Sequence, residues 1–411
     1  MVENGETAPA DLRDVSIAIA LSLIAAVGFY FSIKATQQPF DYTARIASAF
    51  LDGHLGLRSS PPSWLNEMVP RDGNYYSVFP LGAVLSLIPV GLLQKVGAIQ
   101  NFPGHVLAAM IAGFCVYFFF RLSALKGKSL SRRILLALFP IFGTWTWCNL
   151  GFGGAWHIAL GFALLGEVAA LYFILVRSRP FVAGSFFALA FGNRTELILS
   201  LPVYFYLLAW PSRDSLGLKN STRQFLKKVP ALVRFLIGPA VLGLLTAAYN
   251  FARFHSIFDF GYSHIPNVLQ EPWYQQGLFS LHAIPWNMHK MLFEGFGNSP
   301  HFPYIMPYPF GCSIFLSSPF LVLLFREGGK HKLVCWLAIV LLTFALWCHG
   351  NPGGWEFSYR YAMILLPWFF LLVLENGPRS FSTIELILFA VSVAINAIAT
   401  YLFLWTDQIH P

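Results

Sequence analysis

The feature of this sequence that most constrains its fold is a series of apolar stretches. Several are about 17 residues or longer, which is enough for a helix to cross a lipid bilayer. Hydrophobic residues make up 56% of the chain and charged residues 11%, whereas about 25% of a soluble domain is charged. This composition excludes an intrinsically disordered chain and argues against a soluble enzyme. The chain is therefore predicted to be an all-α polytopic membrane protein.

The apolar stretches predict eleven membrane-spanning helices within one module that takes in residues 1–411. No fixed-period repeat or low-complexity tract divides the chain, and few residues follow the last apolar stretch, so no soluble C-terminal domain is expected. The predicted spans are 15–33, 104–121, 134–150, 156–176, 180–192, 196–210, 232–250, 312–325, 333–348, 359–374 and 384–405.

One further apolar stretch, 78–97, is interpreted from the distribution of Lys and Arg. If it does not cross and the N-terminus is cytoplasmic, two thirds of the 27 Lys and Arg residues fall in cytoplasmic segments, as the positive-inside rule expects. If it crosses, the basic segments 121–133 and 326–332 move outside. We therefore predict a re-entrant or interfacial segment at 78–97, in which Pro80 and Pro89 interrupt the helix.

Two predicted outer segments, 34–103 and 251–311, are long, with interfacial helices expected in both. Loops of more than about 15 residues without structure of their own are usually functional. All histidines except His331 also lie on the predicted outer side, so the functional site is expected there. The net charge of +8 is explained by the cytoplasmic basic segments, and no nucleic-acid partner is expected.

The first outer segment contains an acidic residue, Asp41, at the start of an expected amphipathic helix that ends at Gly53. Apolar and polar residues form two neighbouring stripes there at helical spacing, which is typical of a helix lying on a membrane surface. Asp41 has two interpretations. It is an N-cap that pairs with Arg45 at i,i+4, or it is a carboxylate at the membrane boundary that takes a proton from a nucleophile.

Other polar residues cluster where predicted spans meet the outer side. Each cluster has a structural reading, as a turn, an interfacial aromatic belt or a surface ion pair. Each also has a functional reading, as a wall that contacts a sugar or a phosphate. The residues are Arg71, Tyr75 and Tyr76 in the first loop; Arg194 and Glu196 in a short turn; Asn250 and Arg253 after a span; and His349, Glu356, Tyr359 and Arg360 near the last outer turn.

Within the predicted spans, Glu167 is an isolated acid, and a carboxylate at that depth needs a partner or a proton. A transporter usually shows several such groups. No DxD pair occurs outside, so no required metal is indicated, although Asp41 with Asp52 or Glu196 would supply acidic ligands for a divalent cation.

Taken together, five segments resemble the GT-C superfamily of membrane glycosyltransferases. The nearest likeness is to bacterial relatives of protein O-mannosyltransferases and lipid A aminoarabinose transferases. The order of the motifs along the chain is more specific than any single motif. The segments are "DYTARIASAFLDGHL", "YYSVFPLGAVLSLIP", "YNFARFHSIFDFGY", "FGCSIFLSSPFLVLLF" and "WEFSYRYAMILLPW".

The resemblance implies transfer of a sugar from a polyprenyl-phosphate carrier to an acceptor hydroxyl, with inversion and with Asp41 as general base. Basic and neighbouring residues of the outer side would bind the donor phosphate: Arg194, Arg253, Arg360, His349 and Tyr359. Further polar residues would bind the sugar or the acceptor: Asp52, Arg71, Tyr75, Tyr76, Glu196, Asn250 and Glu356.

The resemblance also implies a location and partners. We expect a bacterial inner-membrane protein with a cytoplasmic N-terminus and a site that faces the periplasm. Its partners would be the polyprenyl-phosphate sugar, membrane lipid and a glycan, lipid or protein acceptor. Two alternatives remain open, a transporter or flippase for a lipid-linked saccharide and an inactive scaffold subunit of a cell-envelope assembly.

Overall fold

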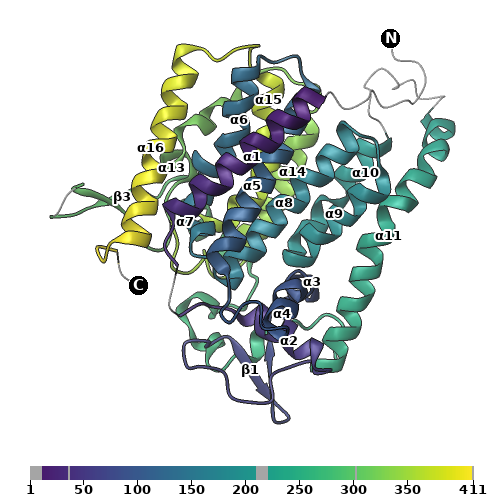
Figure 1. Cartoon of the computed structure of the whole chain (residues 1–411), viewed down its shortest axis with the longest axis vertical. Helices are drawn as coiled ribbons and strands as arrows, with labels where there is room; N and C mark the ends of the chain where they lie inside the picture. Colours follow the sequence, from purple (N-terminus) through teal and green to yellow (C-terminus); the bar gives the residue numbers. More distant parts are fainter. Residues whose placement is uncertain (1–11, 36–37, 210–220, 301–302, 410–411) are drawn as a thin grey trace.

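The computed structural model describes residues 12–35, 38–209, 221–300 and 303–409. Within this part the chain is mostly helical, with two small antiparallel hairpins (Figure 1). The helices are α1 (Leu12–Ser32), α2 (Tyr42–Leu51), α3 (Leu81–Leu85), α4 (Ile88–Lys95), α5 (Gly104–Leu122), α6 (Leu130–Phe142), α7 (Thr146–Gly151), α8 (Ala155–Leu175), α9 (Pro180–Asn193), α10 (Leu201–Ala209), α11 (Ser221–Phe254), α12 (Ile284–Leu292), α13 (Ile314–Ser317), α14 (Lys332–Cys348), α15 (Leu366–Asn376) and α16 (Thr383–Trp405). The hairpins pair β1 (Met68–Arg71) with β2 (Asn74–Ser77) and β3 (Phe296–Asn298) with β4 (Ile305–Pro307).

Helical structure occupies the described part of every predicted span, but several spans are not single helices. The predicted spans 196–210, 312–325 and 359–374 combine a 3-10 helix with an α-helix, and 134–150 divides into α6 and α7 at Gly143. At 312–325 the cause is Pro319, because the residue before a proline is pushed out of the α conformation. Ser318 accordingly has φ −142° and ψ 75°.

The predicted membrane character is confirmed in its broad form. Within the described ranges, five helical segments are long and apolar enough to span a bilayer. The count of eleven spans stays a prediction. The five segments are α1, Gly104–Leu125, α8, Leu226–Phe254 and α16.

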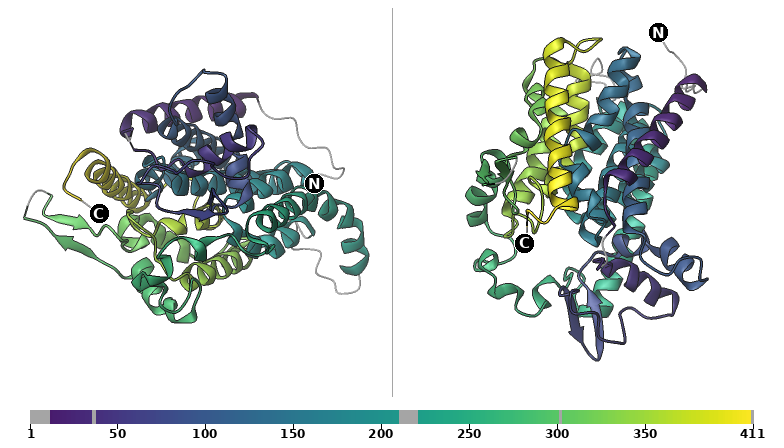
Figure 2. Two further views of the ribbon diagram at one scale, coloured as in Figure 1. Left: turned by 90° about the horizontal axis from the view of Figure 1, so that it is seen from below. Right: turned by 60° about the vertical axis from the view of Figure 1, so that its left-hand side comes forward.

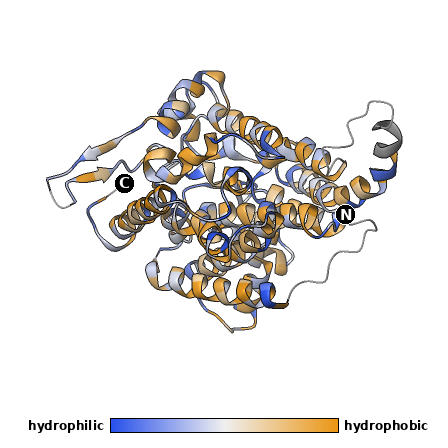
Figure 3. Ribbon diagram, turned by 90° about the horizontal axis from the view of Figure 1, so that it is seen from above, coloured by the Kyte–Doolittle hydropathy of each residue, from blue (hydrophilic) through white to orange (hydrophobic). Residues whose placement is uncertain are grey.

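The bundle has a buried centre and an apolar exterior. Most of α8 is buried, whereas α1, α11 and α16 expose large apolar side chains such as Leu23, Leu244 and Ile387. Figure 3 shows that the ribbon is largely hydrophobic. Extended apolar exteriors are unfavourable in water, so these helix faces are suited to lipid and indicate a membrane protein.

Close helix packing depends on glycines. A Cβ at Gly184 of α9 would collide with the carbonyl of Phe235 on α11, and a Cβ at Gly166 of α8 would meet the backbone of α9 at Phe186 and Ala190. Such close approach of backbones is the usual source of helix association in membranes, where lipid removes the hydrophobic driving force.

Three of the predicted cytoplasmic segments meet at one end of the bundle. Arg132 Nη1 lies 3.0 Å from Glu385 Oε1, and Arg326 Nη1 contacts the same oxygen at 2.6 Å. Arg133 pairs with Asp14 of α1 at 2.6 Å. Asn376 Nδ2 donates to the Arg326 carbonyl at 3.1 Å, and Lys128 Nζ donates to the Gly377 carbonyl at 2.5 Å. Segments 121–133, 326–332 and 375–383 therefore share one side, as the charge distribution predicts.

The opposite end carries α2, α3, α4 and the β1–β2 hairpin (Figures 1 and 2). Segment 78–97 does not run through the bundle. It forms two short helices that begin after Pro80 and at Ile88–Pro89. This agrees with the interrupted, non-crossing segment that the sequence predicts. The side of the membrane on which this end lies remains a prediction.

Candidate functional site

Asp41 occupies the N-cap position of α2, but its side chain makes no capping hydrogen bond. Instead, Asp41 Oδ1 accepts from Arg45 Nε at 2.7 Å. The side-chain capping interpretation is therefore wrong, while the predicted i,i+4 pair is confirmed. The carboxylate is held by a guanidinium and not by backbone amides of its own helix.

The amphipathic sequence of α2 fixes the position of Asp41. Tyr42, Ala44, Ile46 and Ala47 are buried, so one face of the helix packs against the bundle. The ring of Tyr42 lies 5.2 Å from the ring of Trp156, in the first turn of α8. The first turn of α2 is thus anchored to a central helix, and Asp41 is held at the edge of this contact.

Asp41 and Arg45 line a cavity of about 930 Å³, a size within the usual range of small-molecule sites. The cavity is formed by α2, the end of α4 and the segments that precede and follow them. Its lining is mixed: charged, amide and hydroxyl side chains lie beside the rings of Trp64 and Phe102. The polar side chains are Asp41, Arg45, Ser48, Asp52, His54, Arg58, Ser59, Gln94, Gln100 and Asn101.

Two contacts connect α2 and α4 along one side of this cavity. Asp52, at the end of α2, accepts a 2.8 Å hydrogen bond from Lys95 of α4, and this bond lowers the pKa of Asp52. The Ser48 hydroxyl lies 3.4 Å from Gln94 Oε1. The helices α2 and α4 therefore form one polar wall.

The C-terminal part of α4 also exposes apolar side chains. Leu92, Leu93 and Val96 are exposed, close in sequence to the cavity residue Gln94. A polar hollow beside an exposed apolar surface is suited to a ligand that has both a polar head and a hydrocarbon chain.

The three predicted arginines do not line this cavity. Arg194 and Arg360 meet elsewhere, over the ring of Tyr361, with their guanidinium carbons 4.8 and 5.1 Å from its centroid. Arg194 pairs with Glu196 at 2.6 Å, and Arg360 pairs with Glu356 at 3.0 Å. Tertiary packing thus brings these predicted residues together as a second cluster, separate from the lining that contains Asp41.

Of the other predicted residues near the last outer turn, Tyr359 and Glu356 are buried and His349 is half-buried. The Tyr359 hydroxyl is directed to Asn287 and to the Leu346 carbonyl, both at 3.2 Å. His349 Nδ1 lies 2.7 Å from the Asn351 carbonyl, and burial lowers the pKa of His349. Glu356 is fully buried, and its burial raises its pKa to about 8 despite the attraction of Arg360.

Arg253 and Asn250 form another contact, at the end of α11. Arg253 Nη2 donates to Asn250 Oδ1 at 2.7 Å, and Arg253 Nη1 donates to the carbonyl of Ser77 on β2. This joins the second long loop to the first hairpin. The same hairpin carries the remaining predicted residues, Arg71, Tyr75 and Tyr76.

The sequence interpretation missed three polar residues of this end. The helical spacing indicates Arg45 only as the ion-pair partner of Asp41. Arg58 lies in an irregular loop, where no periodic pattern indicates its position. Glu67 is half-buried and accepts from Trp156 Nε1 at 2.8 Å. Burial raises the pKa of Glu67 to about 7, although Trp156 and Arg360 oppose the shift.

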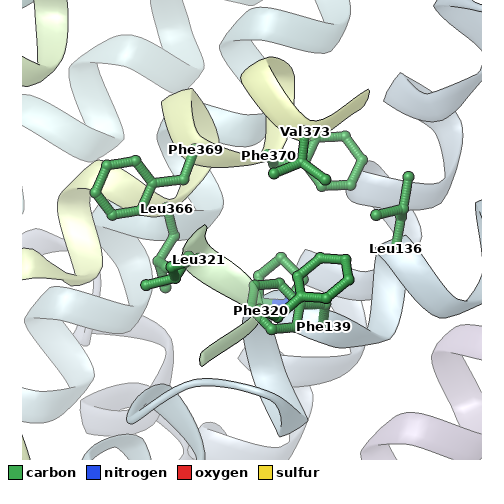
Figure 4. A pocket seen from close by; sticks show the side chains of 9 residues that line it. Leu136, Phe139, Phe320, Leu321, Leu366, Phe369, Phe370 and Val373 are labelled. Carbon is green, nitrogen blue, oxygen red and sulfur yellow. The ribbon is translucent and has the colours of Figure 1, made fainter. Parts of the chain in front are cut away.

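A small apolar cavity and the buried acid of α8 do not form a second site. A void of about 10 Å³ lies among apolar side chains of α6, α15 and the 3-10 helix Pro319–Phe325 (Figure 4). A space of this size holds one water at most, and its apolar lining offers that water no polar partner. The void therefore reflects core packing. Across the ranges that the structure describes, no three His, Cys, Asp or Glu side chains gather as metal ligands. Glu167 Oε1 accepts from Trp368 Nε1 at 3.2 Å, which supplies a partner for one of its two buried oxygens, while Oε2 has none in the described structure.

Comparison with protein families, with curated proteins and with solved structures finds no match to this chain. The resemblance to GT-C transferases therefore depends on the sequence segments quoted above.

Proposed function

We propose that this protein is an integral membrane glycosyltransferase that moves a sugar from a polyprenyl-phosphate carrier to an acceptor hydroxyl. The observation that carries the proposal is that Asp41 lines a large polar cavity at one end of the bundle while making no capping hydrogen bond. A carboxylate that does not cap its helix and lines a cavity is suited to act on a ligand.

In the proposed reaction, Asp41 accepts the proton of the acceptor hydroxyl as that oxygen attacks the anomeric carbon of the sugar. The bond between this carbon and the phosphate oxygen breaks, and the polyprenyl phosphate leaves with the bonding electrons. Attack opposite the leaving group inverts the anomeric centre. The proton on Asp41 then passes to water, which restores the base.

The surroundings of the cavity support this choice of donor. Its polar lining would accommodate the sugar and phosphate, and the exposed apolar residues Leu92, Leu93 and Val96 of α4 would contact the polyprenyl chain. The developing phosphate charge requires cations, since electrostatic stabilisation of a leaving group is often the largest catalytic contribution. Arg45 and Arg58 supply cations in the lining itself. We propose that the active site faces the periplasm of a bacterial inner membrane, because the basic segments gather at the other end of the bundle.

The experiment compares Asp41→Asn with the wild type in proteoliposomes. The donors are undecaprenyl phosphate carrying mannose, glucose, galactose, N-acetylglucosamine or aminoarabinose, and a crude cell-envelope extract supplies the acceptor. Released undecaprenyl phosphate and glycosylated product are measured by mass spectrometry. Loss of a general base is expected to lower the rate at least about 100-fold, with unchanged thermal unfolding.

Asp72→Asn is the matched control. Asp72 is exposed and outside the cavity lining, and its φ of 50° is tolerated by asparagine. This variant should keep full activity. Wild-type rates in Asp41→Asn, or movement of the intact lipid-linked sugar across the membrane without transfer, would overturn the proposal.

A further inference from the structure

We infer that Arg45 binds the phosphate of the lipid carrier while it holds the catalytic base, so that one guanidinium joins Asp41 to the leaving group. This inference rests on the proposed transferase function and deepens it. It assigns the phosphate contact to a residue of the Asp41 cavity, in place of the arginines that the sequence suggests.

The geometry of the pair is the first argument. Arg45 contacts Asp41 through Nε, at 2.7 Å from Oδ1. A guanidinium carries five N–H donors in a planar fork, so the contact through Nε leaves the donors of Nη1 and Nη2 for a second anion. These donors belong to a side chain that lines the cavity and is 36% exposed. Arg45 can therefore hold a carboxylate on one edge and a phosphate on the other.

The remaining charges of the cavity are the second argument. Asp41 is balanced by Arg45, and Asp52 is balanced by Lys95 at 2.8 Å. No ion pair joins Arg58 to any acid in the described ranges, so the lining keeps one cation without a counter-charge. An anionic ligand would supply the missing negative charge. Of the two arginines in the lining, Arg45 is the one that also contacts Asp41.

The rival arginines have other neighbours. Arg194 is paired with Glu196, Arg360 contacts Glu356, and Arg253 is directed to Asn250 and the Ser77 carbonyl. All three lie outside the lining that contains Asp41. A phosphate bound at Arg45 would lie beside the base.

The consequence is a fixed distance between base and leaving group. With Nε on Asp41 and the Nη groups on phosphate, the planar guanidinium sets the separation of the two anions and prevents their mutual repulsion from displacing the base. A lysine cannot do this, since its ammonium is a single point charge on a flexible chain. Arg45→Lys should therefore retain part of the phosphate affinity but less of the transfer rate.

The test measures binding of undecaprenyl phosphate, which needs no knowledge of the sugar. The full-length protein in nanodiscs is titrated with undecaprenyl phosphate and, separately, with undecaprenol, which lacks the phosphate. The wild type should prefer the phosphate. Arg45→Gln should raise the Kd for undecaprenyl phosphate about tenfold or more, as expected for loss of a hydrogen bond to a charged group, and should leave undecaprenol binding unchanged.

Three further variants make the outcomes decisive. Arg179→Gln, which changes an exposed arginine between the C-terminal end of α8 and the start of α9 and outside the cavity lining, should bind as the wild type does. Arg360→Gln tests the rival assignment. Asp41→Asn should keep or improve phosphate binding, because it removes the competing carboxylate. If Asp41→Asn weakens binding as much as Arg45→Gln does, the pair acts only on local structure and the inference fails.

The failures of the inference and of the proposed function are distinguishable. If the wild type prefers undecaprenyl phosphate but Arg360→Gln, and not Arg45→Gln, abolishes the preference, the inference is overturned while the transferase proposal stands. If the wild type does not distinguish undecaprenyl phosphate from undecaprenol, both are overturned.

Discussion

The ion cluster opposite the candidate site yields a prediction about stability. Glu385 and Arg132 are fully buried, and Glu385 also accepts from the partly exposed Arg326 at 2.6 Å. Two nitrogens of Arg132, Nε and Nη2, have no hydrogen-bond partner within the described structure. The charge of Arg132 therefore depends on this one carboxylate, and the perturbation we choose is Glu385→Gln.

The expected cost follows from burial. Removing one partner of a buried ion pair costs about 3–5 kcal/mol, since the other charge is left without compensation. Glutamine at this position can still serve the capping box that Glu385 forms with Ser382, because a Gln at N3 is compatible with that motif. The loss of stability would therefore reflect the missing negative charge and not a missing helix cap. At roughly 2 °C per kcal/mol, we expect the Tm to fall by about 6–10 °C.

The assay is thermal unfolding in detergent, followed by intrinsic tryptophan fluorescence at one scan rate, because irreversible unfolding makes the Tm depend on that rate. The double variant Arg132→Met with Glu385→Gln removes both buried charges and should recover part of the loss. A Tm for Glu385→Gln within about 2 °C of the wild type would refute the reasoning, as would a double variant less stable than the single one. Glu327→Gln, at an exposed position nearby, serves as the control.

Two other predictions concern the burial of Glu356 and the close packing of α9 against α11. Burial raises the pKa of Glu356 from 4.5 to about 8, so the folded state binds more protons than the unfolded state between these values. The stability from this group is complete below about pH 4.5 and is lost as the pH rises through about 8. Glu356→Gln should therefore flatten the fall in Tm between pH 5 and 8.5, and a wild-type slope in this variant would contradict the prediction. Gly184→Ala should cost about 1–3 kcal/mol through overpacking against the Phe235 carbonyl. Gly243→Ala of α11, where a Cβ meets open space, should be neutral or stabilising, and equal Tm shifts in the two glycine variants would exclude the packing argument.

Several features of the fold could be predicted from the sequence because they depend on local patterns. Apolar length predicts the spanning helices α1, α8 and α16, and helical spacing predicts α2. The prolines of segment 78–97 predict the break between α3 and α4. The distribution of basic residues places Arg132 and Arg326 at a common end, where they share Glu385.

The arrangement of polar side chains was less predictable. The sequence grouped Asp41 with Arg194, Arg253 and Arg360, because all lie in a predicted outer segment or at the outer end of a predicted span. The structure divides them among a cavity beside α2, a cluster over Tyr361 and a contact between α11 and β2. Assignment to one side of a membrane restricts a residue to a surface but leaves its position on that surface open.

What the sequence by itself determined is the class of protein and the approximate extent of its helices, because lipid requires long apolar segments whose backbone hydrogen bonds are satisfied internally. What only the tertiary structure decided is which polar groups meet. The local pair of Asp41 with Arg45 faces Gln94 and Asn101 across a cavity, and Glu67 reaches Trp156 across 89 positions of the chain, because the packing of distant segments fixes these positions. Periodicity along one segment carries no information about such long-range contacts.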